Sequence, residues 1–315
     1  MLHWIEIAVD YRCNNRCVGC FAASDDGPEM SERDIYRHLR SAREKGAEGF
    51  WFGGGEPTTR PNFLKIVRSA KKLGFKRIKV QTNGMLCASE ANLDRMLRAG
   101  VTEFNLSIKG ATEEMHDQLA QTAGSFSLLC KAIDLMCAKS VPMEGDILMY
   151  QENTPYLREI IEVFGKKGVS HFNLWHLSLF GATPQQSQEL APQVPKMSDV
   201  ANSLLKLRAH STTGGTPTVT ALHLPPCTLP RKHWDKLFRA AHLGLVVADP
   251  GGSTFRLEES PFEGGTFLER CTQCSARAIC DGLREDYLQI HGDGEFQPAT
   301  GASIDRLPAV AEGEA

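Results

Sequence analysis

Short β-rich runs alternate with amphipathic stretches between Trp4 and Phe180 of this chain, and this alternation limits the fold more than any other feature of the sequence. The candidate strands are residues 4–10, 49–54, 77–82, 103–108, 144–150 and 171–180. The candidate helices are residues 31–45, 62–73, 91–99, 126–139 and 156–167. Repeated strand–helix units predict an α/β fold with a parallel sheet and right-handed crossovers, which is either an open doubly wound sheet or a barrel.

Four short motifs follow the first four candidate strands. They are CNNRCVGC at 13–20, GGGEPT at 53–58, TNG at 82–84 and SIKG at 107–110. In parallel sheets and barrels the carboxyl ends of the strands share one side, and the loops on that side carry the chemistry. We therefore expect the four motifs to surround one mouth.

The composition excludes several classes of protein. The net charge of −3 over 315 residues gives no sign of a nucleic-acid partner, and no stretch is long and apolar enough for a membrane span. The first residues lack the basic segment of a secretory signal, so we expect a cytoplasmic protein. Ten cysteines in such a protein indicate metal or redox chemistry rather than a disulfide framework.

The strand–helix rhythm changes after Gly181, so we expect three parts. Residues 1–181 form the α/β core, and residues 182–298, rich in glycine and proline towards their end, form a C-terminal extension with its own metal site. A helix is expected at 198–209. Residues 299–315 show no apolar periodicity and are expected to be a disordered tail.

The loop after the first strand contains Cys13, Cys17 and Cys20 in the spacing CxxxCxxC. Thiolates are soft ligands for zinc or iron–sulfur clusters. A structural zinc ion would need a distant fourth ligand. A four-iron cluster on these three residues would keep one iron open for substrate. The spacing alone also allows buried cysteines without a metal.

The CxxxCxxC loop, the GGEP sequence after the second strand and the six strand–helix units together resemble the radical S-adenosylmethionine (radical SAM) superfamily. The resemblance covers most of the chain up to Gly181. It implies a partial (β/α)6 TIM-like barrel in which Cys13, Cys17 and Cys20 hold a [4Fe–4S] cluster. It also implies that the open iron binds S-adenosylmethionine, which is cleaved reductively to a 5′-deoxyadenosyl radical that takes a hydrogen atom from the substrate.

The same resemblance implies further cofactor-binding residues. Gly54, Gly55 and Glu56 match the motif that contacts the methionine end of the cofactor, where a carboxylate suits an ammonium group. Ser107 matches a polar position at the end of the fourth strand. Asn83 is a weaker match, because a TNG turn that satisfies its own backbone explains it equally well.

The sequence departs from the family pattern at two places in the core. The residue before the third cysteine is Gly19, where many members have an aromatic residue near the adenine, and Phe21 after the cysteine is the candidate substitute. The fourth-strand motif has Lys109 where many members have aspartate. Lys109 is expected either to pair with a carboxylate or to be solvated, and His116 is expected to be structural.

The extension contains a second group of cysteines. Cys271, Cys274 and Cys280 form CxxCxxxxxC, and Cys227 is the natural fourth ligand. A zinc-ribbon-like site would fit these residues. The spacing also resembles the SPASM extension of peptide-modifying radical enzymes, except that Arg284 replaces the next cysteine.

That departure implies a shortened, Twitch-like extension with a single auxiliary [4Fe–4S] cluster. His223 and His291 are weaker candidates for ligands of this cluster. Among the remaining cysteines, Cys130 and Cys137 lie on one predicted helix and are expected to face the protein core. Cys87 is expected to be a buried thiol rather than a hydrogen-atom donor.

The resemblance implies an enzyme that oxidises or cross-links a peptide or an amino-acid-derived substrate. The alternatives are a radical epimerase, lyase or oxidoreductase that acts on a small metabolite or cofactor precursor, and a non-catalytic iron–sulfur or zinc scaffold. An external electron donor such as a flavodoxin or ferredoxin is implied. Because the core begins almost at the first residue, any leader recognition is expected to come from a separate leader-binding protein or from the extension.

Overall fold

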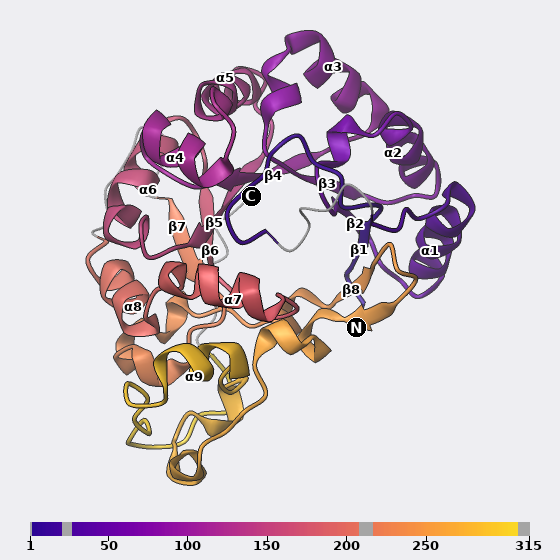
Figure 1. Cartoon of the computed structure of the whole chain (residues 1–315). Helices are drawn as coiled ribbons and strands as arrows, with labels where there is room; N and C mark the ends of the chain where they lie inside the picture. Colours follow the sequence, from indigo (N-terminus) through magenta and orange to yellow (C-terminus); the bar gives the residue numbers. More distant parts are fainter. Residues whose placement is uncertain (1, 21–26, 208–216, 308–315) are drawn as a thin grey trace.

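The computed structural model describes residues 2–20, 27–207 and 217–307. One sheet with the strand order β7-β6-β5-β4-β3-β2-β1-β8-β9 forms the centre of the molecule (Figure 1). All neighbouring strands are parallel except β8 and β9. The strands are β1 Trp4–Ala8, β2 Gly49–Gly53, β3 Arg77–Thr82, β4 Glu103–Ile108, β5 Met143–Met149, β6 His171–His176, β7 Thr218–Ala221, β8 Leu245–Ala248 and β9 Thr254–Arg256.

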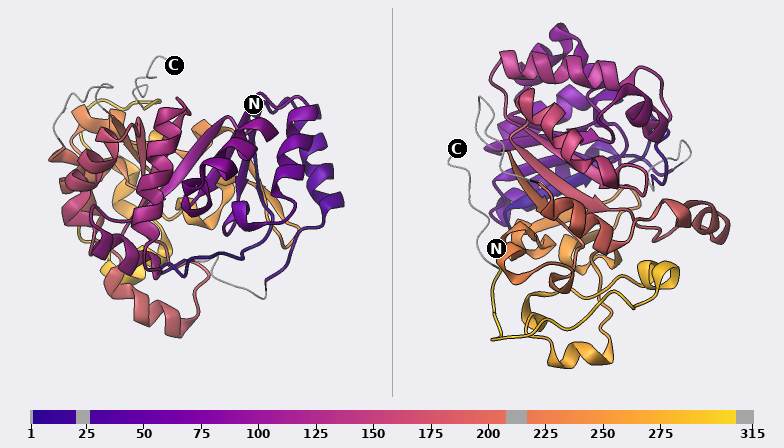
Figure 2. Two further views of the ribbon diagram at one scale, coloured as in Figure 1. Left: turned by 90° about the horizontal axis from the view of Figure 1, so that it is seen from above. Right: turned by 90° about the vertical axis from the view of Figure 1, so that its left-hand side faces the viewer.

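Helices cover the outside of the curved sheet, so that the molecule is a partial barrel (Figures 1 and 2). The helices are α1 Glu32–Glu44, α2 Phe63–Lys72, α3 Glu90–Ala99, α4 Glu113–Ala120, α5 Ser125–Ala138, α6 Leu157–Lys166, α7 Pro184–Leu190, α8 Met197–Leu205 and α9 Glu285–His291. The six predicted strands and the predicted helices of the core are confirmed, and α4 was not predicted. No helix in the described residues has the length and apolar character that a membrane crossing requires.

The two faces of the strands differ in chemistry. Along β4, Phe104, Leu106 and Ile108 belong to the apolar core shared with the helices. The alternate residues Glu103 and Asn105 face the inside of the barrel, because successive side chains of a strand point to opposite faces. The helices are amphipathic and bury one apolar stripe each, which orients them against the outer face.

Three strands after residue 181 belong to the same sheet, among them β7 and β8. β7 pairs with β6, and β8 returns to pair with β1 at the other end of the six-stranded core. The predicted boundary at residue 181 therefore does not separate the sheet. The strands β7 and β8 have only four residues each, too few for an alternating pattern to stand out in the sequence.

The first part of the predicted tail is bound to the extension. The backbone N–H of Ser275 donates to the carbonyl of Ala299 at 2.9 Å, and Arg231 donates to the carbonyl of Ala302 at 2.7 Å. Ile304 and Leu307 pack against the apolar core. Residues 299–307 are therefore ordered by contacts with the extension, whereas the sequence predicted disorder. These contacts involve backbone groups and a few apolar side chains, which leave no periodic pattern in the sequence. Residues 308–315 lie outside the described residues.

Arg284 attaches the extension to the end of β6. Its side chain is 2% exposed, and its guanidinium donates to the carbonyl oxygens of His176 at 3.0 Å and Leu177 at 2.7 Å. The guanidinium also forms an ion pair with Asp286 at 3.2 Å, and Asp286 in turn accepts from the backbone N–H of Leu179 at 2.8 Å. The position where a cysteine would continue the family's spacing is thus occupied by a structural cation.

Replacing Arg284 with alanine should destabilise the protein strongly, because it leaves two buried carbonyls and a carboxylate without their donor. Breaking a buried ion pair from one side costs about 3–5 kcal/mol. The free energy of unfolding from chemical denaturation measures the loss. The control is Arg98→Ala, whose side chain is 70% exposed and which we expect to cost less than about 1 kcal/mol. An equal effect of both substitutions would contradict this role for Arg284.

Candidate functional site

The three predicted cysteine ligands lie together in the loop after β1. Cys13, Cys17 and Cys20 are half-buried, and none of the chain's ten cysteines, all of which are described, is in a disulfide. Burial raises the pKa of Cys13 to about 11, and the nearby Glu56, Cys17 and Cys20 act in the same direction. The metal-free thiol is therefore protonated near neutral pH, and a bound metal would displace its proton.

The loop is fastened to the opposite side of the barrel. The backbone N–H groups of Arg16 and Val18 donate to the carbonyls of Ala120 and Leu119 at 3.2 and 3.0 Å. The hydroxyl of Tyr150, a fully buried residue just after β5, donates to the carbonyl of Val18 at 2.8 Å. No pattern in the sequence indicated Tyr150, because its role depends on the long-range contact between β5 and the cysteine loop.

Gly54 and Gly55 allow the loop after β2 to lie directly on the cysteine loop. The N–H of Gly55 donates to the carbonyl of Asp10, and the N–H of Glu56 to that of Arg12, each at 2.9 Å. A Cβ atom at Gly54 would come within 2.5 Å of the Asp10 oxygen, and one at Gly55 would overlap the backbone of Arg12. Gly54 also has φ +108°, which favours glycine. In the structure these glycines allow close approach to backbone, whereas the sequence suggested approach to a ligand.

The carboxylate of Glu56 is buried and joins the loop after β2 to the end of β3. Its Oε1 accepts from the backbone N–H of Thr58 at 3.1 Å, from the hydroxyl of Thr82 at 2.8 Å and from the hydroxyl of Thr58. Its Oε2 accepts from the backbone N–H of Asn83 at 2.8 Å. Burial raises the pKa of Glu56, and these donors act in the opposite direction. This geometry gives Glu56 a structural role, and its contact with an ammonium group stays a prediction.

Asn83 connects the end of β3 to the cysteine loop. Its side-chain amide donates to the Oδ1 of Asn14 at 2.7 Å, and its own Oδ1 accepts from the backbone N–H of Met85 at 3.0 Å. These contacts bear on the two interpretations of Asn83, as a cofactor-binding residue and as part of a turn that satisfies its own backbone. The second is the local turn bond that TNG predicts, and the first places Asn83 beside the candidate ligands.

Ser107 and Lys109 lie at the end of β4. Ser107 is half-buried and stands opposite Asp146 in the register of β4 and β5. Lys109 is 7% exposed, which is at odds with a solvated side chain. In the described part of the chain no ion pair involves its ammonium group. His116 is buried and accepts from the backbone N–H of Lys109 at 3.3 Å, and burial lowers the pKa of His116 to about 3, as for a structural histidine.

Gly19 cannot be replaced freely by the aromatic residue of other family members. It has φ +63°, and a Cβ atom there would come within 3.0 Å of Cδ1 of Leu177. Phe21, the suggested substitute near the adenine, lies outside the described residues.

Two carboxyl groups inside the barrel were not singled out from the sequence. Burial raises the pKa of Glu6 on β1 to about 7, and Asp146 on β5 adds to this effect. Burial also raises the pKa of Asp146 to about 6, although neighbouring N–H groups oppose it. Asp146 accepts from Gln81 at 3.2 Å and from Asn173 at 3.1 Å. A single acidic residue in an apolar strand is a weak signal, and only the barrel brings β1 and β5 to face each other.

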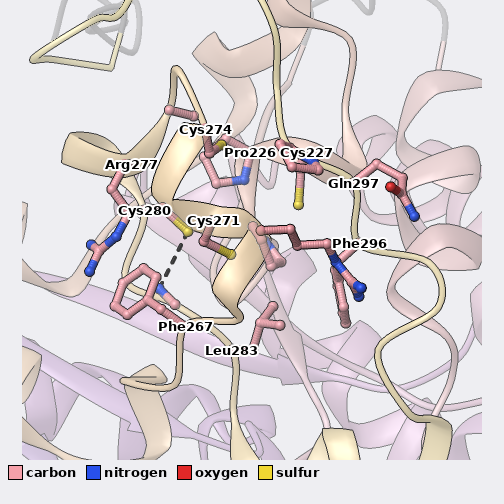
Figure 3. Close-up of a pocket in the computed structure, with 15 residues that line it drawn as sticks. Pro226, Cys227, Phe267, Cys271, Cys274, Arg277, Cys280, Leu283, Phe296 and Gln297 are labelled. Atoms are coloured by element: carbon pink, nitrogen blue, oxygen red, sulfur yellow. Dashed lines mark hydrogen bonds between the residues drawn. The ribbon is translucent and has the colours of Figure 1, made fainter.

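The four predicted auxiliary ligands surround one cavity in the extension (Figure 3). Cys227, Cys271, Cys274 and Cys280 line a space of roughly 420 Å³ that is partly open to solvent. Burial raises the pKa of Cys227 to about 12, and the three other thiols of the group act in the same direction. The structure thus brings Cys227 to the CxxCxxxxxC segment, although β8, β9 and their loops separate the two in the sequence.

Backbone N–H groups point at the sulfur atoms in both cysteine groups. The N–H of Asn15 donates to Cys13 at 3.4 Å, that of Gly282 to Cys280 at 3.3 Å and that of Ala299 to Cys274 at 3.3 Å. Hydrogen bonds of this kind stabilise thiolates and set the potential of iron–sulfur clusters. The donor sets therefore fit such clusters, although no three His, Cys, Asp or Glu side chains of the described residues converge tightly enough to hold a single metal ion.

The weaker ligand candidates Cys87, Cys130, Cys137 and His291 lie outside both cysteine groups. Cys87 is fully buried, with its sulfur 3.8 Å from that of Met96, and burial raises its pKa. Cys130 is half-buried, whereas Cys137 is exposed, so its predicted core position is wrong. The helix α5 turns that cysteine away from the sheet. His291 bonds the carbonyl of Val194 at 2.9 Å.

His223 lies between the barrel and the auxiliary cavity. Its Nε2 is 3.3 Å from the carboxylate of Glu263, and its ring contacts Trp175 of β6 at a centroid distance of 5.8 Å. His223 and Glu263 line a second cavity that shares Pro225, Pro226 and Gly282 with the cysteine cavity. The sequence identified His223 only as a weaker candidate for a ligand.

Replacing Glu56 with glutamine should loosen the mouth, because the new NH₂ group would face at least one N–H or O–H donor. Leaving such a buried group without a partner costs about 1–3 kcal/mol. We expect a lower free energy of unfolding and faster loss of iron from the reconstituted protein. The control, Glu48→Gln on the surface, should change neither quantity. Wild-type stability in the Glu56 variant would contradict the structural role.

Glu6 and Asp146 should make stability depend on pH. Their pKa values lie above the ordinary 4.5 and 3.8, so the folded protein binds these protons more tightly than the unfolded chain. Their contribution is complete below about pH 4 and is lost as the pH rises through 6 and 7. The slope is at most about 1.4 kcal/mol per pH unit for each group.

Denaturation midpoints between pH 5 and pH 8 measure this slope. We expect Glu6→Gln to flatten it and to stabilise the protein at pH 8. Glu48→Gln, which removes an exposed carboxylate, should leave the slope unchanged. An unchanged slope in Glu6→Gln would contradict the assignment.

The fold and parts of the sequence are similar to known proteins. An AdoMet-dependent heme synthase from Oleidesulfovibrio alaskensis is 25% identical over 241 residues, which are 75% of this chain and 58% of that protein. This chain therefore aligns with less than two thirds of that relative.

The structure of SuiB from Streptococcus suis bound to S-adenosylmethionine aligns with 95% of this chain and 77% of its own at 14% identity and a TM-score of 0.69. A structure of anSMEcpe with bound AdoMet and the Cp18Cys peptide aligns with 95% and 93% of the two chains at 14% identity and a TM-score of 0.56.

A model of the family described as "Radical SAM superfamily" matches residues 8–174, which run from the last residue of β1 to Leu174 in β6. The match covers more than half of the chain and contains the cysteine loop and the GGE motif. This chain belongs to the radical SAM superfamily of enzymes.

Proposed function

We propose that this protein holds a [4Fe–4S] cluster on Cys13, Cys17 and Cys20, cleaves S-adenosylmethionine reductively and oxidises or cross-links a peptide or an amino-acid-derived substrate. The observation that carries the proposal is the presence of two separate cysteine groups in one chain. The first lies at the mouth of the barrel, and the second lines a cavity in the extension.

Cofactor binding falls to the residues at the mouth. The three cysteines would hold the cluster, and the backbone around Gly54 and Gly55 together with Ser107 and Asn83 would contact the methionine end and the rest of the cofactor. Lys109, a buried cation without an ion pair in the described structure, suits a carboxylate. When bound, the cluster supplies the electron that cleaves the cofactor and so yields a radical that takes a hydrogen atom from the substrate.

The chain's own residues would position these groups. Glu56 fixes the ends of β2 and β3, and the Asn83–Asn14 bond and Tyr150 fix the cysteine loop. The thiols are half-buried, and hydrogen bonds from several elements hold the loop that carries them. The loop is therefore preorganised for ligands and restricts access of water.

Cys227, Cys271, Cys274 and Cys280 would hold a second [4Fe–4S] cluster in a shortened, Twitch-like extension. Arg284 in place of a further cysteine supports a single auxiliary cluster, because its side chain is committed to the end of β6. A cluster with four thiolate ligands suits electron transfer or a structural role.

The peptide substrate is supported by two similar folds whose structures contain peptides. SuiB has been seen bound to its precursor peptide SuiA, with a TM-score of 0.67 to this chain, and anSMEcpe with a bound peptide. Electrons would come from an external flavodoxin or ferredoxin, and a separate protein would recognise a leader peptide if the substrate has one.

The second candidate is an oxidoreductase or lyase that acts on a small metabolite or cofactor precursor. The similarity to an AdoMet-dependent heme synthase favours it. An epimerase is less well supported, because it needs a thiol donor outside the cluster ligands. Cys87 is closed off in the core, and Cys130 and Cys137 lie on the helix α5 outside the barrel.

Iron and sulfide content after anaerobic reconstitution tests the proposal. We expect about eight irons in the wild type, and about four when Cys13, Cys17 and Cys20 are all replaced by alanine. Replacing Cys227, Cys271, Cys274 and Cys280 should also leave about four. Reductive cleavage of S-adenosylmethionine should disappear only in the first variant.

A variant with Cys130 and Cys137 replaced by alanine is the matched control and should keep all of the iron. About four irons in the wild type, falling to none in the first variant, would remove the auxiliary cluster from the proposal. A wild type that keeps its iron but does not cleave the cofactor would favour the scaffold.

A further inference from the structure

The inside of the barrel carries more carboxylates than cations. On the inward face of β1, β3, β4 and β5 the ionisable side chains are Glu6, Arg77, Lys79, Glu103, Glu144 and Asp146. Four of them neutralise one another at the amino-terminal ends of the strands. Arg77 pairs with Glu103 at 2.6 Å, and Lys79 pairs with Glu144 at 2.8 Å and Glu103 at 3.6 Å.

Glu6 and Asp146 remain without a cation. In the described structure no ion pair involves either carboxylate, and the groups around Asp146 are all neutral donors: the amides of Gln81, Asn173 and Asn105 and the indole of Trp175. The two carboxyl groups come from strands on different sides of the barrel and are close enough to raise the pKa of Glu6. A buried carboxyl group beside a half-buried one, with no cation near either, is unfavourable for a folded protein unless a ligand compensates them.

The backbone leaves room for this arrangement. Gly53, the first glycine of GGGEPT, lies opposite Ala8 of β1, and a Cβ atom at Gly53 would overlap the carboxylate of Glu6. Gly53 is therefore needed for the position of the carboxylate, whereas Gly54 and Gly55 are needed for the cysteine loop.

Unpartnered polar groups lie around the two carboxylates. Asn105 on β4 is 0% exposed, its amide NH₂ faces Asp146, and its oxygen has no hydrogen-bond partner. The indole N–H of Trp51 has no partner either, whereas that of Trp175 faces Asp146. Buried polar groups in folded proteins are nearly always satisfied, so a cluster of open ones marks a place where a ligand or water completes the bonding.

We propose that the inside of the barrel binds a cationic group of the substrate, an ammonium or a guanidinium, between Glu6 and Asp146. This proposal rests on the proposed function, because it places the substrate in the barrel below the cofactor-binding mouth. The oxygen of Asn105 would complete the hydrogen bonds of the cation, and the indole ring of Trp175 beside Asp146 is available to contact it. The site fits a lysine or arginine side chain of a peptide better than a substrate with several carboxylates.

Binding of small probes to the reconstituted protein tests the proposal. Arginine amide is the cationic probe and glutarate is the anionic one, and both are titrated calorimetrically at constant ionic strength. We expect arginine amide to bind to the wild type at least tenfold more tightly than glutarate does. The double variant Glu6→Gln, Asp146→Asn should bind arginine amide at least tenfold more weakly than the wild type.

The substitutions are isosteric and remove buried charge, so the variant is expected to fold, and its denaturation midpoint at pH 8 verifies this. Glu48→Gln is the control for a lost surface carboxylate and should bind as the wild type does. The proposal is overturned if glutarate binds as tightly as arginine amide, if arginine amide shows no binding at millimolar concentration, or if the double variant binds it as the wild type does.

Cleavage of S-adenosylmethionine without substrate, followed in the same variants, separates the two proposals. Normal cleavage with lost probe binding supports the cation site. Absent cleavage with retained probe binding would overturn the proposed function and leave the cation site in place.

Discussion

The buried carboxylate of Glu56 is the interaction on which the mouth of this barrel depends. It accepts hydrogen bonds from the loop after β2 and from the end of β3, and its own backbone N–H bonds to the cysteine loop after β1. One residue therefore sets the relative positions of three strand ends. The two glycines before it remove the side chains that would push the cysteine loop away. A motif that resembles a ligand contact in the sequence thus has a structural reason in this chain as well.

Inside the barrel, in contrast to Glu56, some carboxylates lack compensating partners. At the amino-terminal ends of the strands every cation has a carboxylate, which favours stability. Closer to the mouth, the half-buried Glu6 and the buried Asp146 have no cation, and the buried oxygen of Asn105 has no hydrogen-bond partner. Such features lower the stability of the folded state, and proteins tolerate them where binding or catalysis needs them. The change from compensated to uncompensated charge along the strands points to the part of the barrel that meets the substrate.

Local patterns predicted much of this molecule. The six core strands, most helices and the cysteine loop follow from residue periodicity and spacing, because each is determined within one short stretch of sequence. Cys227 was also correctly grouped with Cys271, Cys274 and Cys280 around one cavity. The strands β7 and β8, the helix α4 and the contacts of Ala299 were missed, since these are short segments that obtain their partners only in the folded chain. The same holds for Glu6, Asp146 and Tyr150.

The extension and the barrel share one framework. β8 follows Cys227 in the chain and returns to pair with β1, the strand that leads into the first cysteine loop. Arg284 follows Cys280 and holds the end of β6, and β6 carries Trp175. His223 then contacts Trp175 on one side and borders the residues that lead to Cys227 on the other. Because these links are strands and buried bonds, the distance between the two cysteine groups is set by the sheet. A fixed separation would suit electron transfer between a substrate in the barrel and the proposed auxiliary cluster.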